Sequence, residues 1–461
     1  MKLLRTCGLA ALPLVLSACA LAPASKIDVP APAQWQAPLA HNGSLTDLNG
    51  WWRAQGDPLL AQLIDTAQAA SPTVASAGAR IAGSRAQRVA ASAALLPSLD
   101  AALSVSRANQ QSTLPGGTAS QVALQSAWEI DLFGARRYER DAAQARLAGA
   151  AAGWHEARVA VAAEVANQYY GLRACEQLLA VAKLDAASRV DSARMTQLAA
   201  DAGFQAPATA ALARASAADG NGRATLQRAL CDIDVKVLSA LSAIDEPALR
   251  ARLAPSAAVA APAIAISALP AELLAQRPDV YAAEREVAAA SFEVGSARAQ
   301  RYPRLSLSGS VGAANFRSGG ENIQTDTWTI GPLALTLPLF DAGRRGANVD
   351  AAKARYEAAV IAYRASARRA VSEVEQALVS LDSSNARSAD AQAALDGYRA
   401  AFVAAEERYK QGLGSLLELE DARRTRLAAE NAVITLQRER NAAWTALYRA
   451  AGGGWTIKNN G

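Results

Sequence analysis

Residues Leu337–Val360 read LPLFDAGRRGANVDAAKARYEAAV, which begins like a β-strand and ends like a long helix. A related stretch, EIDLFGARRYERDAAQARLAGAA, occupies Glu129–Ala152. In each, an apolar run passes within a few residues into a charged segment rich in alanine and other good helix formers. The sequence therefore predicts two abrupt strand-to-helix joints, one after Phe133 and one after Phe340.

The two joints belong to a larger duplication. Two pairs of segments are offset by 206 positions, and a third pair, further along, is offset by 209. The matched pairs are Ser71–Val74 with Arg277–Val280, Leu95–Ser106 with Arg301–Gly312, and Asp141–Arg146 with Asp350–Arg355. Only two copies occur, so the chain is predicted to be a duplicated fold and not a solenoid.

Each half carries the same predicted elements. In the first half a helix runs from Pro72 to about Leu96, and apolar residues then alternate in two strands over 99–105 and 122–130. Good helix formers follow from about Arg136 to Pro207 and on to about Ile244. Their counterparts in the second half are Gly346–Lys410 and Leu416–Arg449. Each half thus predicts a strand pair followed by a long helical hairpin.

Four strands per chain cannot close a transmembrane barrel, because known bacterial barrels have eight or more. No run of 18 or more apolar residues follows the N-terminal segment, so a spanning helix is not expected. Two copies would give an eight-stranded barrel with a packed interior, whereas three would give about 12 strands and a lumen. We therefore expect a trimeric 12-stranded β-barrel continued by a long α-helical barrel.

The N-terminus is typical of a bacterial lipoprotein. Lys2 and Arg5 precede the short apolar run Gly8–Leu16, and Leu16-Ser17-Ala18-Cys19 resembles a lipobox with lipidation at Cys19. The alternative is an ordinary cleaved signal with a chance cysteine. Ala20 stands where an Asp would resemble an inner-membrane retention signal. These features favour an outer-membrane anchor in a Gram-negative bacterium.

The repeat and its flanks define six predicted segments. They are a signal peptide at 1–18, an extended anchor segment at 19–56, a first repeat at 57–247, a linker at 248–268, a second repeat at 269–450 and a tail at 451–461. The linker contains Pro255 and Pro262, which break helices.

Composition argues against an enzyme and against a nucleic-acid-binding protein. The 47 basic and 42 acidic residues nearly balance. The only two histidines are His41 and His155, and no cluster has metal-ligand spacing. No Walker-type phosphate loop is present. We expect no cofactor, no metal site and no catalytic residues.

Several stretches resemble the TolC family of outer-membrane factors, specifically its lipoprotein branch, the NodT-type efflux channels. The matching stretches are WWRAQGDPLLAQLIDTA at Trp51–Ala67, SAWEIDLFGARR at Ser126–Arg137, LPAELLAQRPDVYAAEREVAAA at Leu269–Ala290, ARAQRYPRLSLSGSVG at Ala297–Gly312, LPLFDAGRRGANVDAAKA at Leu337–Ala354 and RYKQGLGSLLELEDARR at Arg408–Arg424. The resemblance covers essentially the whole mature chain.

The resemblance implies a homotrimer in the outer membrane that reaches through the periplasm. A periplasmic adaptor protein and an inner-membrane efflux transporter, often of the resistance–nodulation–division type, would complete the pump. The chain itself would be a passive duct for drugs or other small molecules. The competing readings are a type I secretion or metal-efflux channel and a non-conducting, lipid-anchored periplasmic coiled coil.

The resemblance also places a gate where the helical hairpins end. The two tips are expected around Asp201–Pro207 and Gln411–Ser415, with Gly203 and Gly412 at the turns. Both glycines suit left-handed helix ends. In the family an acidic residue stands two positions after the second glycine, but here that position is Gly414. Three acidic residues nearby, Glu418, Glu420 and Asp421, are candidates to supply the charge, and Glu418 is the one assigned to the tip.

Two further sets of residues are singled out. Cys175 and Cys231 each lie 28 residues from Gly203, on opposite arms of the first hairpin, which predicts a disulfide in an oxidising periplasm. Two buried free thiols are the alternative. We expect the chain to turn at Phe133 and Gly134 in the first joint. In the second joint we expect it to be capped and turned at Phe340, Asp341 and Gly343. The second joint is two residues longer, so the turns should differ while the helices superpose.

Overall fold

The computed structural model describes residues 35–37, 51–54, 56–109, 116–254, 274 and 276–455. Cys19, His41 and the predicted signal peptide lie outside these residues. The chain divides into two compact units, and the long helices contribute to both. Among the described residues, the first unit contains Gly78–Ala152 and Tyr281–Ser366, and the second contains the remainder of the chain from residue 35 onward.

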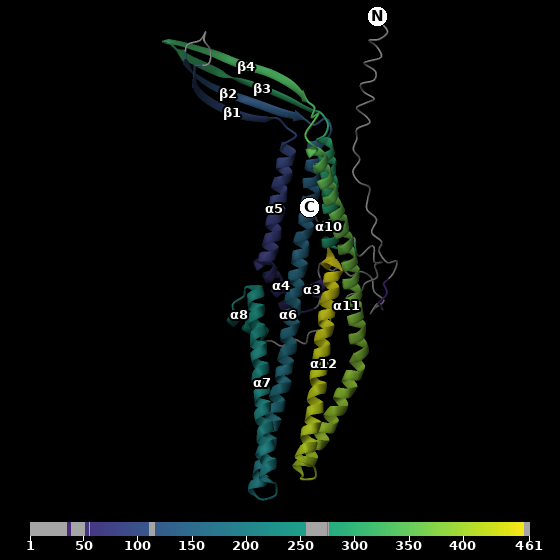
Figure 1. Ribbon diagram of the computed structural model, residues 1–461. Coiled ribbons are helices and arrows are strands. Elements are labelled where there is room, and N and C mark those ends of the chain that lie inside the picture. The colour runs from purple at the N-terminus through teal and green to yellow at the C-terminus, as the bar shows by residue number, and fades with distance from the viewer. Residues whose placement is uncertain are drawn as a thin grey trace. The chain divides into compact units, whose positions relative to one another are not determined.

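The same order of elements occurs twice along the chain (Figure 1). The first series is α5 (Pro72–Ala93), β1 (Ser98–Ala108), β2 (Gly117–Ile130), α6 (Ala135–Asp201) and α7 (Pro207–Ser242). The second series is α10 (Pro278–Ala299), β3 (Arg304–Ser318), β4 (Glu321–Thr336), α11 (Arg344–Lys410) and α12 (Leu416–Ala450). The long helices α6 and α11 have 67 residues each.

In the part of the chain that the structure describes, four short helices lie outside this repeated series. They are α3 (Trp51–Ala54), α4 (Pro58–Ala70), α8 (Glu246–Leu253) and the 3-10 turn η3 (Gly452–Gly454). Helix α8 continues into the first residues of the predicted linker, capped by Asp245, whose carboxylate accepts a hydrogen bond from the Ala248 amide. No described helix is both long enough and apolar enough to cross a membrane.

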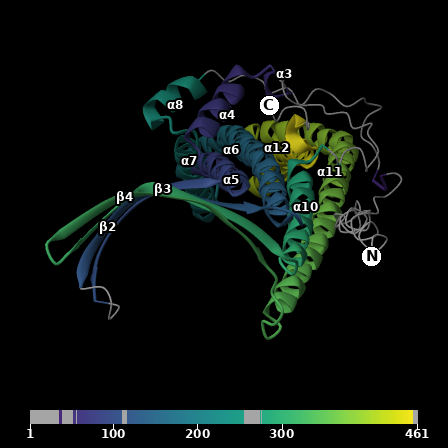
Figure 2. The ribbon, with the colours of Figure 1, turned by 90° about the horizontal axis from the view of Figure 1, so that it is seen from above.

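The first unit contains one curved antiparallel sheet in the order β1-β2-β3-β4 (Figure 2). Side chains alternate between its two faces, and almost all of the large exposed apolar ones fall on one face. We call these ten residues the apolar band: Leu99, Leu103, Val105, Val122, Leu124, Val311, Trp328, Ile330, Leu333 and Leu335. Among the described strand residues, only Ile323 exposes a comparable side chain on the opposite face.

A bulge in β4 keeps the apolar band on one face. Leu307 pairs with Leu333, but Gly309 pairs with Ile330, so β4 has one residue more than β3 at this point. The extra length falls at Gly331–Pro332, where a proline without an N–H is tolerated. Because side chains alternate with a period of two, a regular strand would turn Leu333 and Leu335 to the opposite face. The bulge therefore corrects the register.

The face opposite the apolar band is lined mainly by small and hydroxylated residues. Ser104 and Ser106 on β1 and Ser306, Ser308 and Ser310 on β3 occupy it. Small side chains also permit close strand pairing. A Cβ at Gly312 would lie 2.1 Å from the Val122 carbonyl oxygen. The sheet thus has one apolar face and one polar face, as a wall between lipid and water requires.

Helix segments of the same unit pack through alanine. Ala142 and Ala145 of α6 are buried against Ala289 of α10, with Phe292 beside them. The same two helices are joined by Arg146, which pairs with Glu286 at 2.9 Å and with Glu293 at 2.7 Å.

The second unit has the larger apolar core, built where α4 and α8 pack on the two helical hairpins. Asp57 organises this core: its carboxylate caps α4 through the Leu59 and Leu60 amides and accepts a 2.6 Å hydrogen bond from the Tyr169 hydroxyl. The fully buried leucines of the cluster are Leu60, Leu63, Leu172, Leu238, Leu249, Leu378, Leu381 and Leu447. This core therefore packs the two hairpins together at the level of α4 and α8.

Candidate functional site: the hairpin ends and the ion-pair network

Both hairpins end in the same glycine turn. In the first hairpin, α6–α7, Gly203 has φ +80°, and the Phe204 amide donates to the Ala199 carbonyl at 2.8 Å. In the second hairpin, α11–α12, Gly412 has φ +74°, and the Leu413 amide donates to Arg408 at 2.8 Å. This is the Schellman arrangement, which favours glycine because the residue is left-handed. Both glycines therefore have a structural reason to be present.

The remaining tip residues also make local contacts. Ser415 and Glu418 form a reciprocal capping box at the start of α12, with bonds of 3.1 and 3.2 Å. Asp201 accepts a 2.7 Å bond from Gln197. A Cβ on Gly414 would lie 3.3 Å from the Glu418 carboxylate. The Glu418 carboxylate thus borders the space that a side chain at position 414 would enter.

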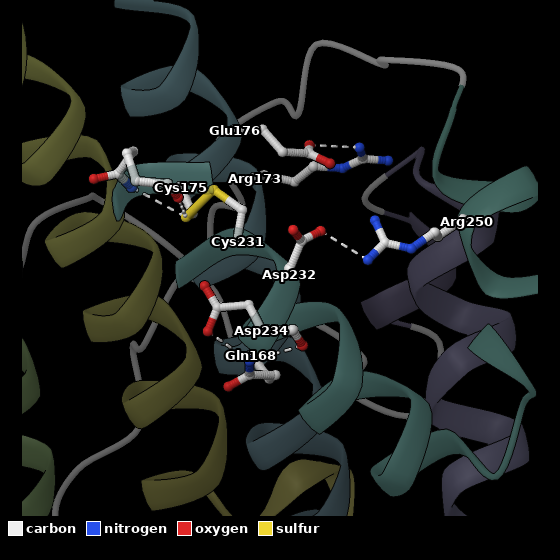
Figure 3. Close-up of a disulfide and its surroundings, with 9 residues drawn as sticks. Gln168, Arg173, Cys175, Glu176, Cys231, Asp232, Asp234 and Arg250 are labelled. Atoms are coloured by element: carbon white, nitrogen blue, oxygen red, sulfur yellow. Dashed lines mark hydrogen bonds and ion pairs between the residues drawn. A yellow bond between two sulfur atoms is a disulfide. The ribbon is translucent and has the colours of Figure 1, made fainter. Parts of the chain in front are cut away.

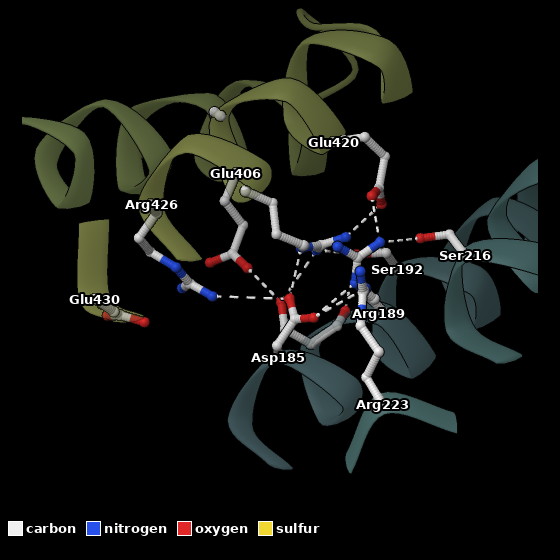
Figure 4. Close-up of polar contacts among 12 residues, drawn as sticks. Asp185, Arg189, Ser192, Ser216, Arg223, Glu406, Glu420, Arg426 and Glu430 are labelled. Carbon is white, nitrogen blue, oxygen red and sulfur yellow. Dashed lines mark hydrogen bonds and ion pairs between the residues drawn. The ribbon is translucent and has the colours of Figure 1, made fainter. Parts of the chain in front are cut away.

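A buried ion-pair network joins the two hairpins further along the helices (Figure 4). Its centre is Asp185 of α6, which is 3% exposed. Four guanidinium groups, from three helices, surround its carboxylate. They belong to Arg189 at 2.8 Å, Arg223 at 3.6 Å, Arg423 at 3.8 Å and Arg426 at 3.9 Å. Asp185 therefore holds cations from both hairpins.

Glu420 of α12 is the second acid of this network. Its carboxylate pairs with Arg189 of α6 at 2.6 Å and with Arg423 of its own helix. Arg423 is fully buried and also donates to Ser192 of α6 at 3.0 Å. Burial lowers the pKa of Arg423 from its usual value. A charge this deep is stabilised only by its partners, so the network depends on each member.

A polar contact between α6 and α11 adds to this connection. The hydroxyl groups of Thr196 and Tyr409 lie 2.5 Å apart. Ser188 donates to Glu406 at 3.3 Å. Both bonds cross from the first hairpin to the second, so the hairpins are held together over more than one helical turn.

A cavity of about 720 Å³ lies beside the network. Its lining combines charged members of the network with aliphatic side chains from α6, α7 and α12. The aliphatic residues are Leu178, Val181, Leu226, Leu417 and Leu427. The cavity is thus a mixed polar and apolar surface between the hairpins.

The first hairpin carries a disulfide between its two arms (Figure 3). Cys175 of α6 and Cys231 of α7 are bonded, with 5.5 Å between their Cα atoms. Gln227 donates a 3.1 Å hydrogen bond to the Cys175 sulfur. The equivalent positions of the second hairpin are Ser384 and Arg440, which cannot form such a bond. In the described residues only the first hairpin is covalently closed.

The two strand-to-helix joints differ. At the second joint Asp341 accepts from the Gly343 and Arg345 amides, and its pairing with Arg345 lowers the pKa of Asp341. At the first joint Gly134 has φ +83°, but the capping carboxylate is Asp131, which accepts from the Arg136 and Arg137 amides.

Phe133 stacks on Tyr302 with centroids 4.9 Å apart, whereas Phe340 is 91% exposed. The equivalent phenylalanines therefore have different surroundings at the two joints.

Several residues of this arrangement were not predicted from the sequence. The network of Asp185, Arg189, Glu420 and Arg423 matches no motif; only the helical spacings of Asp185 with Arg189 and of Glu420 with Arg423 hint at pairing. The capping role of Asp131 was not predicted, because Asp131 precedes its phenylalanine, Phe133, whereas the equivalent cap Asp341 follows Phe340. Among the described residues, no group of His, Cys, Asp and Glu has the geometry of a metal site.

The family model and the similar proteins of known function agree on one protein family. The family model described as "Outer membrane efflux protein" matches residues 63–241 and 269–453. The chain is 30% identical to the outer membrane protein OprJ of Pseudomonas aeruginosa, over 96% of this chain and 94% of that protein. It is 29% identical to the toluene efflux pump outer membrane protein TtgI of Pseudomonas putida, over 97% and 98%.

Solved structures agree with the fold. The outer-membrane channel OprN superposes with a TM-score of 0.83 at 28% identity, covering 93% of this chain and 99% of that chain. The Campylobacter jejuni channel CmeC gives a TM-score of 0.81 at 23% identity, over 95% and 94%, and supports the fold alone. With a family model matched across both repeats, the chain belongs to the outer membrane efflux protein family.

Proposed function

We propose that this chain is the outer-membrane channel subunit of a tripartite efflux pump and that it conducts small molecules without acting on them chemically. The observation that carries the proposal is the sheet with its apolar band on one face and small, polar residues on the other. Such a sheet suits a wall between lipid and a water-filled lumen.

The same sheet supports a homotrimer. In the described residues β1 and β4 are the outer strands of the sheet, and each has one edge without a partner strand. In lipid an unpaired edge is very costly, so the edges of neighbouring copies would pair. Three copies would supply 12 strands, a number within the range of known channels. Lipidation at Cys19 would anchor each copy in the outer membrane.

We further propose that the ion-pair network holds the two hairpins in a closed arrangement and that the tips, Asp201–Pro207 and Gln411–Ser415, form the periplasmic gate. Asp185 and Arg423 come from different hairpins and are both buried. Separating the hairpins would break these contacts, so the network favours the closed state. Glu418 is assigned a capping role in addition to its charge.

A periplasmic adaptor and an inner-membrane transporter are the proposed partners. The cavity beside the network would receive an amphipathic helix of the adaptor, because its lining mixes aliphatic and charged side chains. Relatives are named for the efflux of toluene and of solvents. We therefore propose small organic molecules as the cargo.

The test is reconstitution of the full chain in planar bilayers. We expect stepwise currents and a detergent-stable trimer that heat converts to the monomer. The matched control is Gly312→Val, because a side chain there would collide with the Val122 carbonyl and disrupt the β2–β3 pairing. A wild-type preparation that is monomeric and gives no current would refute the channel.

A further inference from the structure

One row of the sheet presents hydrogen-bond donors from all four strands on the face of the apolar band. Arg107 pairs with Thr118, Thr118 pairs with Arg317, and Arg317 pairs with Asn322. Directly paired residues lie on the same face of an antiparallel sheet. The row therefore contains two guanidinium groups, a hydroxyl and an amide. We call these four residues the donor row.

The two arginines are close enough to act together. Adjacent strands are about 4.8 Å apart, so the backbones of Arg107 and Arg317 are about 10 Å apart across Thr118. Both arginines are exposed, and Arg317 Nε donates to the Asn322 side chain at 3.3 Å. Flexible arginine side chains at this separation can converge on one anion or hold two neighbouring ones.

No acidic side chain lies in the donor row or in the next row on this face. The next row consists of Val105, Ser120, Asn315 and Gln324. The nearest described acid on the face is Asp326, four positions along β4 from Asn322 and so about 13 Å away. Glu321 belongs to the opposite face, because it pairs with Ser318. The donor row is thus locally cationic.

The donor row lies just beyond the end of the apolar band. On β1 the band ends at Val105, two residues before Arg107. The helices begin after the opposite ends of the strands, at Ala135 and Arg344. If those helices extend into the periplasm, as the proposed function requires, the donor row lies at the outer surface of the membrane.

We propose that the donor row binds the phosphate groups of an anionic phosphorylated glycolipid in the outer leaflet, whose acyl chains cover the apolar band. This inference rests on the proposed function, because it needs the band to face lipid. One molecule with both acyl chains and phosphates fits the continuous surface formed by the band and the row. Arginine suits phosphate because its planar fork binds two oxygens at once.

The test compares lipid binding by purified wild-type trimer, by the single variants Arg107→Gln and Arg317→Gln, and by the double variant, using native mass spectrometry. The probes are diphosphorylated lipid A, the same lipid after enzymatic dephosphorylation, and inorganic phosphate. The control is Arg304→Gln, which removes a charge from the opposite face at the helix end of β3. Each variant is first checked for the heat-sensitive trimer and for current in planar bilayers.

We expect wild type to prefer the phosphorylated lipid and to lose this preference as salt rises. The affinity should fall about fivefold for one substitution and about 30-fold for both, with no change for Arg304→Gln. Equal binding of the two lipids by wild type, an unchanged double variant, or effective competition by inorganic phosphate would overturn the proposal. Normal currents in the same preparations would then leave the proposed channel function intact, whereas their absence would count against the channel itself.

Discussion

Replacing Asp185 with asparagine should open the closed channel. The substitution keeps the shape of the side chain but removes a carboxylate charge that faces four guanidinium groups at 2.8–3.9 Å. Removing one partner of a buried pair costs about 3–5 kcal/mol, because the other charge stays buried. Arg423, which is 0% exposed, would remain buried with Glu420 as its acidic partner, so this range is an upper limit.

The effect on opening comes from the two contacts that cross between the hairpins, those of Asp185 with Arg423 and Arg426, because the contacts with Arg189 and Arg223 lie within the first hairpin. A loss of at most about 3–5 kcal/mol would shift the balance between closed and open states by at most about 10² to several thousand-fold. The measurement is the open probability of the reconstituted channel in planar bilayers. The matched control is Glu439→Gln, which breaks the exposed pair with Arg387 within the second hairpin and should cost at most about 1 kcal/mol.

A double-mutant cycle separates the latch from a general loss of stability. Asp185→Asn and Arg423→Gln should together open the channel less than the sum of their separate effects, because they remove the same interaction. Strictly additive effects, or an open probability for Asp185→Asn that equals that of Glu439→Gln, would refute the reasoning. The heat-sensitive trimer must survive in every variant compared.

Three smaller perturbations test other parts of the chain. Replacing Cys175 and Cys231 by serine should destabilise the first hairpin by up to about 4 kcal/mol, given the 56-residue separation, measured as faster amide exchange in α7; equal exchange would contradict it. Glu418→Gln should keep the α12 cap but lower cation preference in bilayer currents, whereas Glu418→Ala should also fray the first turn by about 1 kcal/mol, seen by amide exchange. Pairing with Arg345 lowers the pKa of Asp341 below its usual 3.8. The Asp341 cap of α11 should therefore be present above pH 3.8, and it should be lost as the pH falls below 3.8 through the lowered pKa. In wild type the amides that Asp341 caps should exchange slowly above pH 3.8 and lose this protection at lower pH. In Asp341→Asn they should exchange fast at every pH, and the same protection in that variant as in wild type would contradict the assignment.

Much of the fold follows from the sequence because the repeat presents each pattern twice. The alternation at Leu99 and Leu103 and the long proline-free stretches fix strands and helices within a few residues. The β4 bulge did not follow, because Gly331-Pro332 is typical of the end of a strand. In the structure the bulge lies within β4, where it keeps Leu333 and Leu335 on the apolar face.

The candidate site was only partly predictable. Glycine turns depend on local backbone preferences and were found, and the two cysteines were placed by their equal distance from Gly203. The ion-pair network depends on side chains more than 200 positions apart, and the internal repeat does not reproduce it. Asp185 and Arg189 correspond, at the offset of 209, to Ala394 and Tyr398. The internal repeat therefore predicts the helices and strands that both halves share, but not the ion pairs between the hairpins, which have no counterpart in the repeat.

The disulfide also changes what a broken peptide bond would do. Cys175 and Cys231 close a covalent ring that contains the whole first tip, whereas the second tip belongs to an open chain. A protease that cut between Gly203 and Pro207 would leave both arms of the first hairpin attached. The same cut at Gly412 would release the end of α11 from α12, apart from packing. The two tips have the same backbone turn, yet a single cleavage could detach one arm of the hairpin only at the second tip.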